Sequence, residues 1–189
     1  MTICAYLVHW DEFVAQFKKR YAKDHTFLYR ADEDQEPWLT RTSAFWTDST
    51  TIAFVTSEAY DEVREQMKPA DRKISDKLLG ALFWHIPSRG CTPAWVHDLR
   101  LKADREVFCI TMKPKTVKDY LHLASAKTIR SLRHGFQEFW NEATVDQKDY
   151  YAGRVDDADA FIRYASMWVN LLKEAARKKK GVVVSWHGT

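Results

Sequence analysis

The sequence predicts an α+β fold, a mixed sheet with several amphipathic helices packed on it, organised as a single domain over residues 1–189. Strand-like and helix-like segments follow one another unevenly, whereas a doubly wound sheet needs regular alternation. A chain of 189 residues is long enough for one hydrophobic core, and its 46% hydrophobic and 29% charged residues are near the averages of globular proteins. No repeat, linker or low-complexity tract divides the chain.

The N-terminal part of the chain predicts a strand, a helix, a second strand and a loop. Residues 2–8 are mostly apolar and β-prone, as expected of a buried strand. The segment that follows has apolar residues at helical spacing, and we expect one helix face to carry Trp10, Phe13, Val14, Phe17 and Tyr21. Residues 26–29 are a candidate second strand, and the acidic stretch 32–37 is expected to form a loop.

The middle of the chain predicts a strand, two helices and a long connection. Residues 50–56 are rich in β-branched side chains, which favours a strand. Ser57 is a candidate cap for a helix that ends at Lys68-Pro69 and buries Tyr60, Val63 and Met67. A further helix is expected from about Asp71 to about Trp84, with one face formed by Ile74, Leu78, Ala81 and Leu82. Residues 85–105 form a connection interrupted by proline and glycine, where functional residues are often found.

The C-terminal half predicts a strand at 106–111, three helices and a last strand at 182–186. Pro114 begins the first helix, because proline is well tolerated in the first turn. The second helix carries Ile129, Leu132, Phe136, Phe139 and Trp140, and a polar stretch follows it. Asp156 or Asp157 caps the long third helix, and Gly181 is expected at its C′ position. Its apolar face contains Phe161, Tyr164, Ala165, Trp168, Leu171, Leu172 and Ala175.

Charge, cysteine usage and hydropathy exclude several classes of protein. The net charge is +3, from 29 basic and 26 acidic residues, which is too balanced to indicate a polyanionic partner. Three widely spaced cysteines indicate neither a disulfide framework nor a zinc site. No apolar stretch approaches the roughly 20 residues that span a bilayer, and no signal sequence opens the chain, so we expect a cytoplasmic protein without membrane contact. The common phosphate-binding, hydrolase and metalloprotease motifs are not present.

Three aromatic residues lie where helical periodicity does not explain them. Trp38, Trp46 and Trp95 occur in segments with proline or glycine, beside charged residues. One hypothesis is that at least two of them line a concave binding patch that has Arg30 and His97 at its rim. The alternative is that these loops fold back and bury the indoles as satellites of the core, because tryptophan is highly buried on average.

A second pattern favours an enzyme. Residues 27–31 look like the first strand of ADP-ribosyltransferases, in which an arginine at the position of Arg30 holds the dinucleotide. Residues 42–48 resemble the serine-threonine strand of that family and supply Ser43 or Thr47, and Glu106 is the candidate for its late glutamate. This resemblance implies NAD as cofactor and a carboxylate beside the developing oxocarbenium ion. The alternative is that Arg30 ends one strand and Glu106 begins another.

Two blocks of the C-terminal half carry a family resemblance. Residues 110–117, with a strand, a proline and a helix start, and residues 161–184, with a closing helix and a terminal valine strand, are similar to the corresponding parts of the YfbM-like family of small bacterial proteins of unknown function. Residues 76–82 are a fainter match to a central helix. The resemblance implies an α+β fold, no established catalytic residues and a role in toxin-immunity or defence loci.

The first function hypothesis is therefore a non-catalytic protein-binding protein without a cofactor, in concrete form an immunity protein that neutralises a toxin. Tryptophan and tyrosine are enriched in interface hot spots, and the chain has eight of each. The alternative is the NAD-using enzyme. A third hypothesis, nucleic-acid binding, rests on the basic run 177–180, which is otherwise explained as the cationic end of the last helix. The sequence does not define an oligomeric state.

Overall fold

The structure is a computed structural model that describes residues 2–20, 31, 33–41, 50–79 and 108–187, and it confirms the α+β class. For residues 2–4, 50–55, 57, 108–110 and 185–187 the structure describes the backbone alone. Contacts within the chain divide it into two compact units. Unit 1 comprises 1–48, 94–119 and 171–189, and unit 2 comprises 49–93 and 120–170. The single domain over residues 1–189 stays a prediction.

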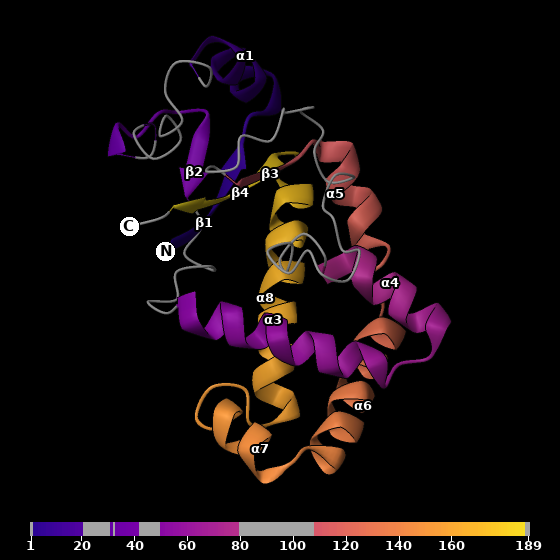
Figure 1. Cartoon of the computed structure of the whole chain (residues 1–189). Helices are drawn as coiled ribbons and strands as arrows, with labels where there is room; N and C mark the ends of the chain where they lie inside the picture. Colours follow the sequence, from indigo (N-terminus) through magenta and orange to yellow (C-terminus); the bar gives the residue numbers. More distant parts are fainter. Residues whose placement is uncertain (1, 21–30, 32, 42–49, 80–107, 188–189) are drawn as a thin grey trace. The chain divides into compact units, whose positions relative to one another are not determined.

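Unit 1 is built on a sheet of four described strands, β1 (Thr2–Val8), β2 (Leu39–Arg41), β3 (Phe108–Met112) and β4 (Gly181–His187), shown in Figure 1. Their order is β2-β1-β4-β3, and each described pair is antiparallel. The expected mixed sheet is therefore wrong for the described strands, although the strands predicted at the two ends of the chain are confirmed. Val8 pairs with Gly181 and Met112 with Val182, so β1 and β3 both end where β4 begins.

Helix α1 (Trp10–Arg20) covers this sheet, as its apolar spacing predicts. Phe13 and Phe17 are buried, with ring centroids 5.5 Å apart, while Trp10 and Val14 are partly buried at the edge of the same cluster. The loop expected at 32–37 is confirmed for residues 34–37 and is wrong at residue 33, which is helical, while residue 32 lies outside the described residues. The candidate strand at 26–29 lies outside the described residues.

Gly181 does not have the role that the sequence predicts. The left-handed residue that ends the last helix is Lys179, with φ 55°, and the amide of Lys180 donates to the carbonyl of Ala175 at 2.9 Å. Gly181 is instead the first residue of β4, where a Cβ atom would lie 2.6 Å from Cε3 of Trp10 and 2.8 Å from the carbonyl oxygen of Met112. The glycine is needed for this close approach.

Unit 2 contains α3 (Thr50–Glu65), α4 (Pro69–Leu79), α6 (Ala126–Glu142) and α7 (Val145–Tyr151) (Figure 1). Helices α5 (Pro114–Leu121) and α8 (Ala158–Arg177) have residues in both units. Helix α6 packs against both α3 and α4. None of the helices in the described part of the chain is both long enough and apolar enough to cross a membrane.

The strand expected at 50–56 is wrong, because these residues form the first turns of α3. Helical spacing describes the buried residues Thr56, Ala59, Tyr60 and Val63. No glycine or proline interrupts residues 50–65, so nothing in the sequence divides a strand from a helix there. The preference of β-branched residues for strands is small and depends on context, so a continuous buried helical face overrides it. The predicted burial of Tyr60, Val63 and Met67 is confirmed.

Helix α4 has the predicted position but a different buried face. Ile74 is 37% exposed, whereas Ser75, Leu78 and Leu79 are buried, so the expected face is wrong at Ile74. Periodicity counts only apolar side chains, so it selects Ile74 in place of the buried Ser75, whereas Leu78 is buried as predicted. The expected continuation of the face through Ala81 and Leu82 lies outside the described residues.

Helix α7 occupies the stretch that the sequence leaves as polar. Thr144 and Gln147 form a reciprocal capping box, in which Oγ1 of Thr144 accepts from the Gln147 amide at 3.3 Å and Oε1 of Gln147 accepts from the Thr144 amide at 2.9 Å. The T-x-x-Q pattern was present in the sequence as a signal for this helix.

The sequence prediction is most accurate for helix α8. The seven residues assigned to its apolar face are all buried, and Asp157 rather than Asp156 caps it, accepting from the Ala160 amide at 2.6 Å. In unit 2, Phe161 stacks on Phe136 of α6 with centroids 5.2 Å apart. Trp168 is fully buried, and its indole N–H donates to the carbonyl of Leu78 at 2.9 Å.

Candidate functional site

Only one of the site residues predicted from the sequence is described. Trp38 is 3% exposed and packs 6.1 Å from Phe13 in the core of unit 1, which is the position that the core alternative gave it. The other members of the predicted patch, Trp46, Trp95, His97 and Arg30, lie outside the described residues, and so do the NAD-site candidates Ser43, Thr47 and Glu106. The shared patch and the NAD site therefore stay predictions.

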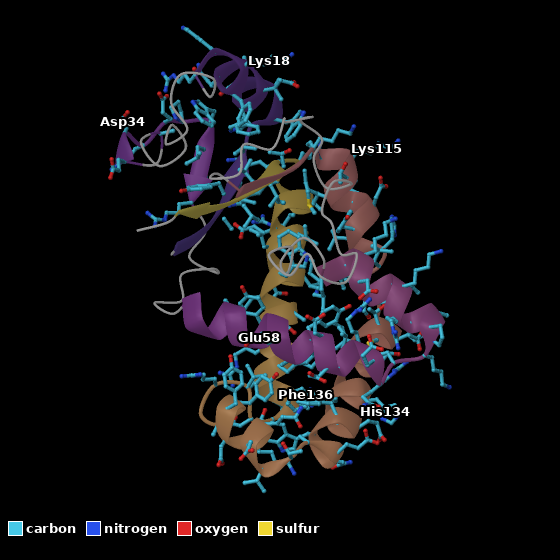
Figure 2. All side chains as sticks on the ribbon, in the orientation of Figure 1. Lys18, Asp34, Glu58, Lys115, His134 and Phe136 are labelled. Carbon is cyan, nitrogen blue, oxygen red and sulfur yellow. The ribbon has the colours of Figure 1, made fainter. Side chains whose placement is uncertain are left out.

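The described part of unit 2 has a cleft that sequence reasoning missed. This α4–α6 cleft has a volume of about 300 Å³ and is lined by Gln66, Met67, Lys68, Asp71, Lys127, Arg130, Ser131, His134 and Gly135. Its residues come from the connection between α3 and α4, from the first turn of α4, and from one face of α6. His134, labelled in Figure 2, belongs to that face.

Local sequence signals place these side chains. Pro69 starts α4, so Lys68 immediately precedes the helix and Asp71 lies in its first turn. Ser125 caps α6, and its hydroxyl accepts from the Thr128 amide at 3.1 Å. Three of the basic residues of α6 then follow at positions 127, 130 and 134, a spacing that puts them on one helix face.

Asp71 is the one carboxylate among the lining residues, and α6 holds it in place. Nζ of Lys127 lies 3.1 Å from Oδ1 of Asp71, and the hydroxyl of Ser131 donates to Oδ2 at 3.1 Å. These hydrogen bonds, that of Lys127 first, hold the pKa of Asp71 below its ordinary value of 3.8. Asp71 is therefore ionised at neutral pH, and its charge is matched by Lys127.

The remaining basic groups give the cleft a positive balance. Lys68 and Arg130 are exposed, and neither forms an ion pair with any residue in the described ranges. Nδ1 of His134 lies 3.6 Å from Oε1 of Glu138, and the His134 side chain is 70% exposed. Two cations and a histidine therefore remain after Asp71 and Lys127 are paired.

The back of the cleft is a close contact between α3 and α6. Met67 is buried, and Gly135 is buried inside α6. A Cβ atom on Gly135 would lie 3.0 Å from the carbonyl oxygen of Val63 and 3.0 Å from Cγ of Met67. The apolar back and basic rim can together hold a small anionic group on a short apolar stem.

Carboxylates outside the lining limit what can bind. Glu142 accepts from Nε2 of Gln66 at 3.1 Å, Glu65 pairs with Arg72 at 3.2 Å, and Glu138 faces His134. The cleft is thus a compact positive site with acidic groups attached to its border. Among the described residues, no group of three or more His, Cys, Asp or Glu side chains has the arrangement of a metal site.

Compared with known protein families, with curated proteins and with solved structures, the chain shows no significant match.

Proposed function

We propose that the chain is a non-catalytic protein-binding protein, and that its α4–α6 cleft receives an acidic side chain of the partner. The observation that supports this proposal is the charge balance of the cleft, which has Lys68, Lys127 and Arg130 against the single carboxylate of Asp71. Asp71 forms its ion pair with Lys127, and neither Lys68 nor Arg130 forms one with a described residue. Arg130 offers the planar fork that pairs with a carboxylate, and such charge-assisted hydrogen bonds are stronger than neutral ones. In concrete form, the partner is a toxin that the chain neutralises.

The border of the cleft favours an acidic protein segment over a nucleic acid. A nucleic acid presents a row of phosphates and binds by neutralising several of them together. The carboxylates of Glu138 and Glu142, which contact the lining residues His134 and Gln66, would repel the phosphates on either side of the one bound. A single aspartate or glutamate between neutral residues avoids this repulsion, which is how like charges reject a wrong partner.

Affinity capture from cells of the source organism tests the proposal with one charge reversal and its matched control. Arg130→Glu reverses a charge in the cleft, whereas Arg163→Glu reverses an exposed arginine of α8 that does not line it. We expect one protein to be retained by the wild-type chain and by Arg163→Glu, and lost from Arg130→Glu. Changing the matching acidic residue of that protein to arginine should restore binding to Arg130→Glu.

Equal capture by Arg130→Glu and wild type would contradict the proposal, and so would a complex that nuclease treatment destroys. If the captured protein is a toxin, cells that express it should survive with the wild-type chain or Arg163→Glu and die with Arg130→Glu. Survival with all three variants would show that the cleft is not needed to neutralise the toxin.

The enzyme alternative makes a different prediction for the purified chain. We expect no consumption of NAD, and we expect Glu106→Gln to capture the partner as the wild type does. If NAD is cleaved, and both Arg30→Ala and Glu106→Gln abolish cleavage while each variant retains the wild-type circular dichroism spectrum, the non-catalytic part of the proposal is wrong.

A further inference from the structure

A second cleft lies in unit 1, at the edge of the sheet where three connections meet. β1 and β3 are each antiparallel to β4, so they run in the same direction and end at one edge. Helix α1 begins after β1 and helix α5 begins after β3, while the last residues before β4 arrive at the same edge. This strand-end cleft has a volume of about 440 Å³ and is lined by His9, Trp10, Asp11, Glu12, Lys113, Pro114, Lys115 and Lys179.

Trp10 gives the cleft a fixed aromatic wall. Its ring lies against the backbone of Gly181, where a Cβ atom would be 2.6 Å from Cε3, and its centroid is 5.7 Å from that of Phe13. The indole is partly buried and lines the cleft. An indole held in this way can stack with a planar ring such as a nucleobase, and such stacking does not depend on which base is present.

Lys179 is the member of the basic run 177–180 that lines this cleft. Nζ of Lys178 pairs with Glu174 at 2.7 Å, and Nζ of Lys180 donates to Thr40 at 3.2 Å. Lys179 has the left-handed backbone conformation that ends α8, and it lines the cleft together with Lys113 and Lys115. The basic run therefore supplies one cation to a site that two lysines from another part of the chain complete.

The start of α5 adds a smaller attraction for an anion. The first turn of α5 contains no acidic residue, and Pro114 is its first residue. The dipole of this helix end therefore has no negative side chain from its own first turn, unlike α1, which has Asp11 and Glu12. Lys115, labelled in Figure 2, lies in that turn.

We propose that the strand-end cleft binds a mononucleotide, with the base on Trp10 and the phosphates at Lys113, Lys115 and Lys179. The carboxylates of Asp11 and Glu12 line the same cleft and can accept hydrogen bonds from ribose hydroxyls. A cavity of about 440 Å³ is within the size range of small-ligand sites. This site is independent of the α4–α6 cleft and of the proposed partner protein.

Calorimetric titration of the full chain with adenosine diphosphate tests the assignment. We expect saturable binding that is tighter than that of adenosine or of pyrophosphate, because each of these probes lacks one half of the recognised chemistry. Lys179→Gln should weaken adenosine diphosphate roughly tenfold, the size of a typical charge-assisted contact. Lys18→Gln, an exposed lysine of α1 that does not line the cleft, is the matched control and should bind as the wild type does.

Trp10→Phe tests the stacking wall while keeping an aromatic ring beside Gly181, and it should weaken adenosine diphosphate more than pyrophosphate. The assignment is overturned if adenosine diphosphate does not bind, if pyrophosphate binds as tightly as adenosine diphosphate, or if Lys179→Gln and Lys18→Gln have equal effects. It is also overturned if a short oligonucleotide binds while the mononucleotide does not, because the ligand would then be a nucleic acid. Thermal unfolding of each variant confirms that the fold is kept.

Discussion

At the scale of single residues, Asp71 couples the charge of the α4–α6 cleft to the stability of the fold. Hydrogen bonds from Lys127 and Ser131 lower its pKa below 3.8, so the folded state favours the ionised carboxylate. The resulting stabilisation is present above the ordinary pKa and is lost as the pH falls through the lowered one. Asp71→Asn removes this effect. The difference in free energy of unfolding between wild type and Asp71→Asn should therefore be constant near neutral pH and shrink as the pH falls through 3.8 and then through the lowered pKa of the folded state.

Urea titrations at a series of pH values measure this difference. A difference that is constant over the whole acidic range would show that Asp71 has the same pKa in the folded and the unfolded chain. Ser131→Ala is the companion variant, because it removes one of the two hydrogen bonds while leaving the carboxylate and Lys127. It should reduce the pH dependence without abolishing it.

Trp168 is the residue on which we expect stability to depend most. It is 0% exposed, and its N–H donates to the carbonyl of Leu78. Trp168→Ala should cost roughly 3–5 kcal/mol, which is typical when a large aromatic side chain is removed from a core. Trp168→Phe keeps most of the apolar volume and should cost less. A loss below about 1 kcal/mol for Trp168→Ala in a denaturant titration would contradict the assigned burial.

At the scale of elements, the contact of α3 with α6 depends on Gly135. Alanine is favoured over glycine inside a helix by about 1 kcal/mol, so propensity alone predicts that Gly135→Ala is stabilising. The added Cβ atom would, however, meet the backbone oxygen of Val63 at 3.0 Å. We expect a net loss of about 1–2 kcal/mol, because overpacking shifts the backbone. Chemical denaturation measures this loss, and a variant more stable than wild type would show that α3 yields to the new methyl group.

The same scale shows which elements could be predicted from the sequence. Helices α1 and α8 each have a wide apolar face, and their positions are confirmed because burial of that face determines the helix. The strand prediction for residues 50–56 is wrong because the local β-propensity and the buried face of α3 favour different structures. Helix α7 is short and polar, so only its capping box marked it.

The α4–α6 cleft was not predictable because it arises from packing between elements. Lys127, Arg130 and His134 have helical spacing in the sequence, but nothing local indicates that Lys68 and Asp71 lie beside them. The strand-end cleft has the same origin, since Trp10, Lys113 and Lys179 are brought together by the pairing of β1 and β3 with β4. A functional surface assembled from residues far apart in the chain needs the sheet order and the helix contacts before it can be recognised.

At the scale of the whole molecule, the described part of each compact unit contains a cleft beside the start of a helix, where a lysine precedes the proline that begins the helix. Lys68 precedes Pro69 at the start of α4 in unit 2, and Lys113 precedes Pro114 at the start of α5 in unit 1. The two clefts differ in what surrounds the lysines. The first has a carboxylate held by α6 and no aromatic side chain in its lining besides His134, whereas the second has the indole of Trp10. This difference is the reason for assigning an acidic side chain to one cleft and a nucleotide to the other.

Carbodiimide cross-linking tests the central claim most directly, because it joins a bound carboxylate to the lysine it contacts. The probes are a short peptide that has one glutamate between neutral residues and the partner recovered by affinity capture, each with the full chain, and mass spectrometry identifies the lysine. We predict cross-links at Lys68 that are lost in Arg130→Glu and kept in Arg163→Glu. Cross-links of equal yield at Lys68 and at exposed lysines away from the cleft, such as Lys73 and Lys173, or no effect of Arg130→Glu, would contradict it.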